Sequence, residues 1–259
     1  MKNLSCIEPY TYYYENIPPY SVYSYPCFED PDFVEEIGLS LSELQWLLQY
    51  SRHLNEWIVE NFIDTTDAFD YRMGELKDLV PASAWAEKDI NAAREAGLIT
   101  AGTDGYFRMG ITREQFAELV VNFTEKLTGT PIVPAPAATF TDTQNTDVLK
   151  AYNAGIVNGT GRNTFSPSGV CTREEIAAML YRADEYIEKV KEAKYLEPDA
   201  SIDRFSDSSS VSGWARQSIG ILVNNRIMEG TSSSLLSPRD TATIEQCIVI
   251  LLRLYGKIA

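Results

Sequence analysis

Hydrophobic residues recur at intervals of three and four along three separate stretches of the chain, and each stretch contains two such series. The two series are separated by a loop rich in Gly, Ser, Thr and Asn. This spacing is typical of amphipathic helices that bury one face. We therefore predict an all-α fold of three helix–loop–helix units. The apolar positions expected in the core are Ile90, Ala93, Leu98, Phe116, Leu119, Val120, Val148, Ala151, Ile156, Ile176, Met179, Leu180, Ile219, Leu222, Ile227, Cys247, Ile250 and Leu251.

The second helix of each unit opens with the same local signal. Residues 112–115, 172–175 and 243–246 read TREQ, TREE and TIEQ. Each fits a capping box, in which Thr and Glu or Gln satisfy each other's backbone N–H groups at a helix start. Three such boxes at matched positions indicate an internal repeat. Because one helix pair cannot enclose a core alone, we expect the three units to pack together.

The repeats divide the chain into modules joined by short connectors. We place module 1 at residues 76–130, module 2 at 131–194 and module 3 at 195–259. The Pro/Ala/Thr-rich stretch 128–139 should be extended and semi-rigid. Residues 195–203 form the second connector.

The chain upstream of the repeats has a different character. Residues 1–33 are rich in Tyr and Pro, which disfavours a regular helix and predicts an extended arm, either loose or lying on another surface. Residues 34–75 carry a heptad-like apolar seam that predicts a long helix. That helix could pack on its own chain or form an oligomer, for which a trimer is favoured. The polar Asn55 lies at a seam position and is of the type that sets register.

Charge and composition exclude several classes of function. The chain has 22 Lys and Arg against 37 Asp and Glu, a net charge of −15, which argues against nucleic-acid binding. No apolar run is long enough to cross a membrane, and no apolar leader is visible at the start. Four dispersed cysteines and a single histidine, His53, predict neither a metal site nor a disulfide framework. No catalytic or nucleotide-binding motif is present, so we expect a non-enzyme without cofactors.

The repeats also share ordered motifs outside the helices. The aromatic-x-Asp motif lies at 140–142 and 205–207, and Trp-Ala begins at Trp85 and Trp214. A Gly-bounded run occupies 155–159, and Phe-x-Pro occupies 165–167. Thr-Arg-Glu lies at 112–114 and 172–174. In this order they resemble S-layer homology domains. The resemblance covers about residues 76–258 and has the usual number of three modules. It implies a pseudo-threefold helical spindle that binds secondary cell-wall polysaccharide, commonly through an acidic, pyruvylated sugar.

The resemblance also implies which residues contact the sugar. They are Arg113, Arg173, Trp85, Trp214, Thr112, Thr172, Gly159 and Gly230. Independently, a helix start offers free N–H groups and partial positive charge, and an Arg fork can bind a carboxylate. The competing interpretation is structural, because Thr112 and Thr172 are helix caps, the arginines could pair internally and the tryptophans could be core anchors.

Departures from the family pattern limit how many sites we expect. Ile244 replaces the Arg in the third unit, and Thr143 takes the place of the Trp in the second. In the first, Ala101 replaces the second Gly, and the Phe-x-Pro becomes residues 107–109. We therefore expect one or two competent sites.

The function predicted from the sequence is binding of cell-wall polysaccharide. The chain would either anchor a bacterial surface protein or serve as the attachment fibre of a phage whose arm docks onto the virion. The alternatives are a structural assembly protein whose repeats no longer bind sugar and, more weakly, an enzyme acting on wall glycan. Bacterial cell surface or virion is the expected location.

Overall fold

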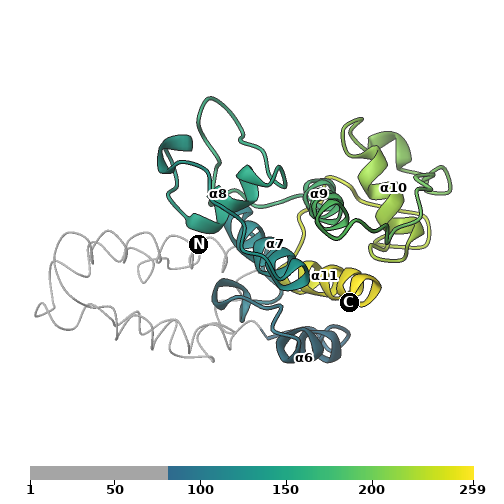
Figure 1. Ribbon diagram of the computed structural model, residues 1–259. Helices are drawn as coiled ribbons and strands as arrows, with labels where there is room; N and C mark the ends of the chain where they lie inside the picture. The colour runs from purple at the N-terminus through teal and green to yellow at the C-terminus, as the bar shows by residue number, and fades with distance from the viewer. Residues whose placement is uncertain (1–80) are drawn as a thin grey trace, which may run out of the picture. The chain divides into compact units, whose positions relative to one another are not determined.

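The computed structural model describes residues 81–259, and helices make up its regular secondary structure (Figure 1). Three short helices alternate with three long ones, and the prediction of an all-α fold is confirmed for this part of the chain. The short helices are α6 (Glu87–Glu95), α8 (Thr146–Asn153) and α10 (Arg216–Asn224), and the long ones are α7 (Arg113–Thr128), α9 (Arg173–Lys191) and α11 (Ile244–Ile258). The predicted arm at 1–33 and the predicted helix at 34–75, with Asn55, lie outside the described residues.

The long helices begin where the sequence predicts, and all three capping boxes form. In α7 the Thr112 hydroxyl accepts the N–H of Gln115 at 3.2 Å, while the Gln115 side chain accepts the N–H of Thr112 at 3.0 Å. The same reciprocal pair begins α9 and α11. At its other end α7 stops at Gly129, whose φ of 66° lies in the left-handed region that glycine adopts without strain.

A closed ring of backbone hydrogen bonds joins the three modules just before these long helices. The ring residues are Ile111, Cys171 and Ala242, each of which directly precedes a helix-capping Thr. Ile111 N–H donates to Ala242, Ala242 N–H donates to Cys171, and Cys171 N–H donates to Ile111, at 2.9 to 3.0 Å. Each module therefore gives one bond and receives one, and the bond between Ile111 and Ala242 joins residues 131 positions apart.

The core lies where the helices of different modules face each other. Helix α7 packs against α8 and α9, α9 packs against α10, and α11 packs against α6 and α7. The contact of α11 with α6 brings the end of the chain onto module 1. All of the predicted core positions are buried.

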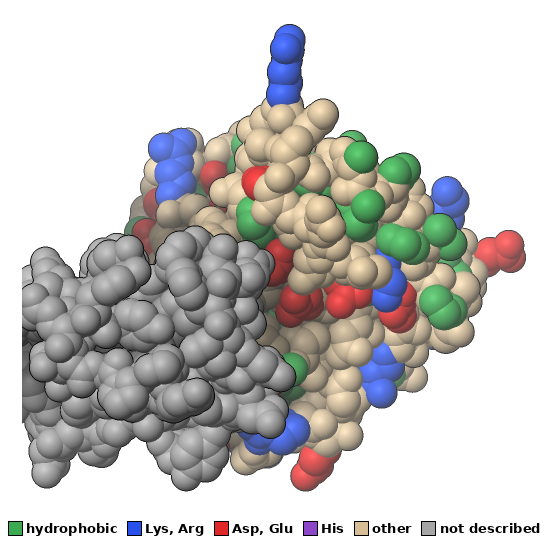
Figure 2. All heavy atoms as spheres, turned by 90° about the vertical axis from the view of Figure 1, so that its left-hand side faces the viewer, with side chains coloured by type: hydrophobic (Ala, Val, Ile, Leu, Met, Phe, Trp, Pro, Cys, Tyr) green, Lys and Arg blue, Asp and Glu red, His purple; other side chains and the backbone are tan. Residues whose placement is uncertain are grey.

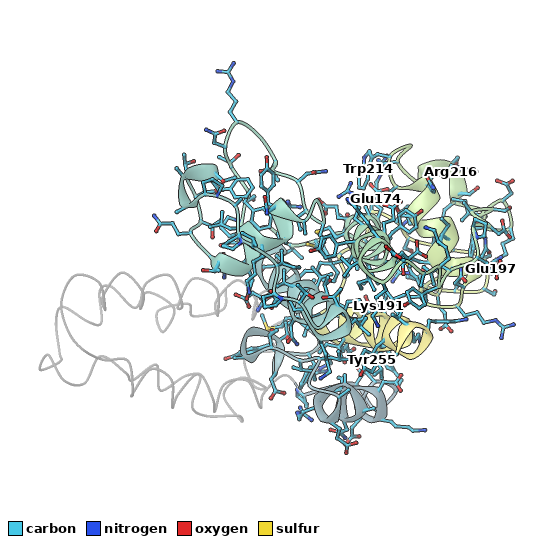
Figure 3. All side chains as sticks on the ribbon, viewed as in Figure 1. Glu174, Lys191, Glu197, Trp214, Arg216 and Tyr255 are labelled. Carbon is cyan, nitrogen blue, oxygen red and sulfur yellow. The ribbon has the colours of Figure 1, made fainter. Side chains whose placement is uncertain are left out.

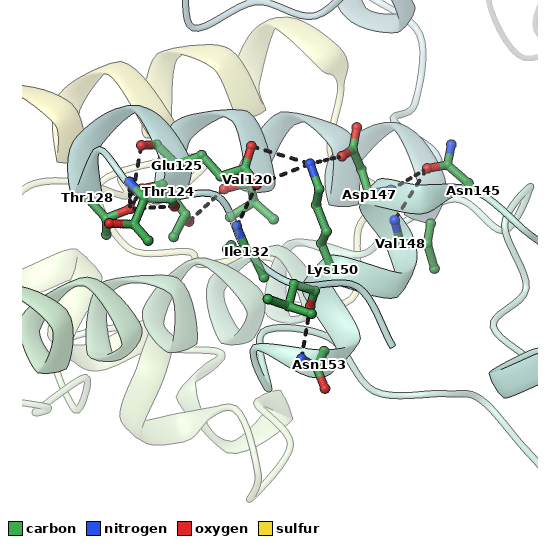
Figure 4. A network of polar contacts seen from close by, with 12 residues as sticks. Val120, Thr124, Glu125, Thr128, Ile132, Asn145, Asp147, Val148, Lys150 and Asn153 are labelled. Carbon is green, nitrogen blue, oxygen red and sulfur yellow. Dashed lines mark hydrogen bonds and ion pairs between the residues drawn. The ribbon is translucent and has the colours of Figure 1, made fainter. Parts of the chain in front are cut away.

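Polar contacts add to this packing where α7 meets α8 (Figure 4). The ammonium of Lys150 lies 3.1 Å from Glu125 of α7 and 3.1 Å from Asp147 in its own helix. Although partial burial lowers the pKa of Lys150, its bonds to these carboxylates raise it overall. Glu125 also accepts the N–H of Ile132 at 2.8 Å, which ties the Pro/Ala/Thr-rich connector to α7.

Within residues 81–259, each helix is too short or too polar to span a bilayer.

Candidate functional site

Each long helix starts against a loop of the next module, so the structure contains three equivalent joints. We name them by module. The 1–2 joint is the start of α7 with residues 158–169, the 2–3 joint is the start of α9 with residues 229–240, and the 3–1 joint is the start of α11 with residues 105–109.

The backbone N–H groups at these helix starts are already engaged. At the 1–2 joint, Arg113 N–H donates to Gly169 at 2.8 Å and Glu114 N–H donates to Pro167 at 3.1 Å. The hydroxyl of the capping Thr112 accepts the third N–H group of the helix, that of Gln115. The other two joints repeat this pattern. The expectation that free helix-end amides attract an anion is therefore wrong, because carbonyl groups of the next module satisfy them.

Arg113 is used to hold the next module's loop. Its side chain is buried, and its Nε donates to the carbonyl of Phe165 at 2.9 Å while Nη2 donates to Asn158 at 2.8 Å. The guanidinium lies 4.7 Å from the centroid of the Phe165 ring, and Nη1 is 3.6 Å from Glu175. The competing, structural interpretation of Arg113 thus has direct geometric support.

Arg173 occupies the equivalent position at the 2–3 joint. Its Nε donates to the backbone carbonyl of Leu236 at 3.0 Å, and its Nη2 donates to the backbone carbonyl of Glu229 at 2.6 Å. In contrast to Arg113, it forms no ion pair with a carboxylate of the described residues within 4.0 Å. Burial lowers the pKa of Arg173, and the charges of Asp240 and Asp207 oppose this shift.

At the 3–1 joint, buried apolar residues take the place of this arginine and its facing loop residue. Ile244 stands at the Arg position and is buried, as is Met109 of the facing loop, whose carbonyl accepts the N–H of Ile244 at 2.9 Å. An uncharged pair of this kind stabilises the joint by burying apolar area and offers no cation to a ligand.

The third residue of the Thr-Arg-Glu motif has a role that the sequence reading missed. Glu174 accepts both the N–H and the hydroxyl of Ser212, at 2.9 and 2.8 Å, and Glu245 accepts both from Ser83 at 2.8 Å. Glu114 accepts the hydroxyl of Thr143 at 2.9 Å. We call these three contacts the glutamate latches. The Ser-x-Trp-Ala shared by residues 83–86 and 212–215 was the sequence signal that could have revealed them.

The latches also correct the alignment of the repeats. Thr143 matches Ser83 and Ser212 rather than a Trp, so the residue at the Trp position of module 2 is Asn145. Asn145 caps α8 by accepting the N–H groups of Asp147 and Val148.

The Phe-x-Pro motif needs a similar shift in module 1. Phe107 accepts the N–H of Glu245, as Pro167 and Pro238 do for the other helices, so Phe107 matches the Pro and not the Phe. Because the loops differ in length between the modules, the sequence alone did not reveal either alignment.

The loops between the helices of modules 2 and 3 are held by the aspartates of the aromatic-x-Asp motif. Asp142 accepts the N–H groups of Phe165 and Ser166, and Asp207 accepts those of Leu236 and Ser237. Although desolvation raises the pKa of Asp142 and of Asp207, these backbone bonds lower both overall.

The two predicted glycines lie where these loops close tightly. A Cβ at Gly159 would lie 2.8 Å from the carbonyl oxygen of Thr164, and one at Gly230 would lie 2.4 Å from that of Leu235. Both positions therefore exclude a side chain for reasons within the loop itself.

Trp85 and Trp214 are the most exposed aromatic side chains of the described region. Their side chains are 55% and 56% exposed, so neither is the core anchor considered as an alternative. Figure 3 shows Trp214 beside Glu174, the residue that follows Arg173. An exposed indole offers a flat apolar face with one N–H donor, which suits contact with a sugar ring.

The eight residues predicted to contact the sugar are distributed unequally among the three joints. Arg113, Thr112 and Gly159 lie at the 1–2 joint, whose Trp position holds Asn145. Trp85 lies at the 3–1 joint, through the Ser83 latch, together with Ile244.

The remaining four residues come together at the 2–3 joint. They are Arg173, Thr172, Trp214 and Gly230. Only this joint of the described modules combines a buried arginine with an exposed indole.

Other chemistry is sparse within residues 81–259. The structure holds no group of three or more potential metal ligands there. Cys171 and Cys247 are buried free thiols, and burial raises the pKa of Cys171 to about 12. Figure 2 shows acidic and basic side chains intermixed on one face of this part of the chain.

These features define a class of protein in which three helical modules close on one another and present loops and tryptophans at their joints. Residues 75–117, 139–177 and 204–243 match the model of the S-layer homology domain. The chain therefore contains three segments that match the S-layer homology domain, as the motifs predicted.

Similar curated proteins are larger than this chain. An amylopullulanase of Thermoanaerobacterium thermosulfurigenes is 26% identical over 196 residues, which is 73% of this chain and 10% of that protein. An endoglucanase of Bacillus sp. is 29% identical over 70% of this chain and 19% of its own length. S-layer protein EA1 of Bacillus anthracis is 28% identical over 69% of this chain. This chain spans a tenth to a fifth of each relative.

Proposed function

We propose that the chain anchors itself to the bacterial cell surface by binding an acidic cell-wall polysaccharide, without catalysing a reaction. Enzymes and S-layer proteins share similarity with this chain over the same modules, which fits a common anchoring part attached to different partners. S-layer homology domains are anchoring modules, and the relatives include proteins named for the surface layer.

The 2–3 joint is the proposed sugar site, and the co-location of Arg173 with Trp214 is the observation that carries this proposal. Nε and Nη2 of Arg173 hold the loop, and no described residue is bonded to its Nη1. The guanidinium keeps its positive charge beside the loop, where it favours a carboxylate. Trp214 supplies an apolar face for the sugar ring, and Gly230, which has no side chain, lets the loop backbone approach the sugar. Thr172 acts indirectly by capping α9.

The 1–2 joint is the weaker candidate of the two that hold an arginine. Glu175 partly neutralises Arg113, and Asn145 provides no aromatic face there. In the proposal Arg113, Thr112 and Gly159 therefore shape the joint more than they bind. Trp85 has no arginine beside it because Ile244 fills the position.

The two tryptophans provide a matched test. Trp214→Ala should lower retention on purified cell walls by about tenfold or more, the value of roughly 1.4 kcal/mol of lost ring contact. Trp85→Ala, which removes an equally exposed indole, should change retention little. The measurement is a pull-down on walls with and without chemical removal of the secondary polymer. Equal losses in both variants, or retention that does not need the polymer, would contradict the proposal.

A structural assembly protein remains the second candidate, and the use of both arginines as loop anchors favours it. It predicts that the wild-type chain shows no polymer-dependent retention. In that case Trp214→Ala and Trp85→Ala would both leave assembly unchanged.

The proposal extends to residues 1–80 from their sequence pattern alone. The Tyr/Pro-rich segment and the heptad-like seam suit an oligomerising attachment region, such as that of a phage fibre docked on a virion. Light scattering should report an oligomer, a trimer being favoured, for the full chain and a monomer for residues 81–259. A monomeric full chain would overturn this part of the proposal.

A further inference from the structure

Helix α9 buries two carboxylates one turn apart. Asp184 is only 1% exposed, and its Oδ1 is buried without a hydrogen-bond partner. Glu188, four residues later, is 6% exposed. Two carboxylates on one face of a helix repel each other when both are charged, and burial strengthens that repulsion.

Glu188 is engaged in holding the turn that follows α9. One of its carboxylate oxygens accepts the N–H of Tyr195 at 3.0 Å, and the other pairs with the ammonium of Lys194. Its backbone carbonyl accepts the N–H of Ala193 at 3.1 Å. Both carboxylate oxygens of Glu188 thus accept from the turn, and any movement of this carboxylate is transmitted to residues 193–195.

This turn leads directly into module 3. Tyr195 and Leu196 pack against the core, and Glu197 N–H donates to the side chain of Asn225 at 3.0 Å, next to the end of α10. The Asn225 side chain returns a bond to the carbonyl of Glu197 at 2.9 Å. Residues 193–197 are therefore the link through which Glu188 attaches module 3 to α9.

The charges that act on Asp184 come from a small set. They are Glu188 and Glu185 of α9 itself and Lys194 of the turn, while α7 and α10, which pack against α9, contribute none of them. Lys194 is 83% exposed, so solvent screens its attraction. Burial first, and Glu188 second, raise the pKa of Asp184 to about 7.

We propose that Asp184 is a pH-sensitive lock on the attachment of module 3. Protonated Asp184 leaves Glu188 free to hold the 193–197 turn. Ionised Asp184 places a second buried negative charge beside Glu188, which pushes the Glu188 carboxylate away from Tyr195 and loosens the turn.

The direction of the effect follows from linkage. Asp184 has a higher pKa in the folded chain than its ordinary value of 3.8. The folded state therefore holds the proton more tightly, and this contribution to stability is complete below about pH 4. It is lost progressively as the pH rises through about 7. Glu188 thus holds the 193–197 turn firmly in acid, and the turn is loosened in mildly alkaline solution.

The chain itself supplies a replacement for the test. Thr124 stands in α7 where Asp184 stands in α9, since both lie eleven positions after the first helical residue, and Thr124 is fully buried. Its hydroxyl donates to the carbonyl of Val120 at 2.7 Å. Asp184→Thr therefore removes the charge with a side chain that this fold already buries. Asp184→Asn is a second neutral variant, and Glu185→Gln removes an exposed carboxylate next to it as the control.

The experiment compares these full-length variants at one pH, which removes the pH dependence of the protease. At about pH 8.5, trypsin should cut the wild-type chain after Lys191 and Lys194 several times faster than it cuts Asp184→Thr. Glu185→Gln removes the weakest of the charges that act on Asp184, so it should lie much closer to the wild type than Asp184→Thr does. At about pH 5.5 the thermal unfolding midpoints of wild type and Asp184→Thr should lie close together, and they should separate as the pH rises. Equal cleavage rates at pH 8.5, or parallel midpoints across this range, would overturn the proposal. If Asp184→Thr fails to fold, the same comparison applies to Asp184→Asn.

Discussion

At the scale of single residues, the two arginines predicted to contact the sugar are buried, and each holds the loop of the next module. Arg113 gives two hydrogen bonds to loop carbonyls and lies over the ring of Phe165. These bonds are planar and directional, so a lysine, which has a single point charge, cannot reproduce them.

We therefore expect Arg113→Lys to destabilise the fold by about 1 to 3 kcal/mol, because the buried carbonyl of Phe165 and the more accessible carbonyl of Asn158 lose their donors. Arg108→Lys is the matched control, since the Nε of Arg108 is buried without a partner and its replacement removes no hydrogen bond to residues 81–259. Urea denaturation of the two variants measures the difference. A control as destabilised as Arg113→Lys would show that bulk, and not hydrogen bonding, is what matters.

At the scale of secondary structure elements, glycine has opposite consequences in two helices. Gly220 lies in α10, where an added Cβ would come within 2.0 Å of the carbonyl oxygen of Ala200 in the connector. Gly256 lies in α11, where an added Cβ meets no atom within 4 Å. The same residue type is thus required by packing in one helix and is only a cost to helix stability in the other.

This difference predicts changes of opposite sign. Gly220→Ala should destabilise the chain by about 2 kcal/mol or more, because the connector cannot keep its path over α10. Gly256→Ala should stabilise it by about 0.5 to 1 kcal/mol through helix propensity. Thermal or urea unfolding measures both, and a stabilising Gly220→Ala would contradict the described path of the connector.

At the scale of the whole molecule, the glutamate latches and the backbone ring make the modules mutually dependent. The last latch, between Ser83 and Glu245, joins residues 162 positions apart and connects module 3 back to module 1. A repeat array stacked in a line would leave its two ends unpaired, whereas here both ends meet.

A double-mutant cycle on this latch tests the closure. Ser83→Ala and Glu245→Gln should each destabilise the chain, and their coupling energy should be about 1 to 3 kcal/mol because the carboxylate is buried. The exposed Glu87→Gln, close to the same turn, should show no coupling to Ser83→Ala. Additive effects of Ser83→Ala and Glu245→Gln would mean that the modules do not close.

Much of the fold could be predicted from local patterns, because the interactions behind them span only a few residues. The apolar periodicity, the three capping boxes and the repeat itself involve neighbours within one or two helical turns. They located the starts of α7, α9 and α11 to the residue and placed the core correctly. The capping role of Thr112 and Thr172 was likewise foreseeable.

The site depended on contacts that no local pattern encodes. The sequence by itself determined the helices, their caps and the likeness to S-layer homology domains. Only the tertiary structure decided that Arg173 shares a joint with Trp214, Arg113 with Asn145 and Trp85 with Ile244, through the glutamate latches beside them. It also decided that the helix-end amides are taken by the next module. The reason is physical: each of these pairings joins different modules, so its geometry is set by how all three pack and not by the residues that flank it.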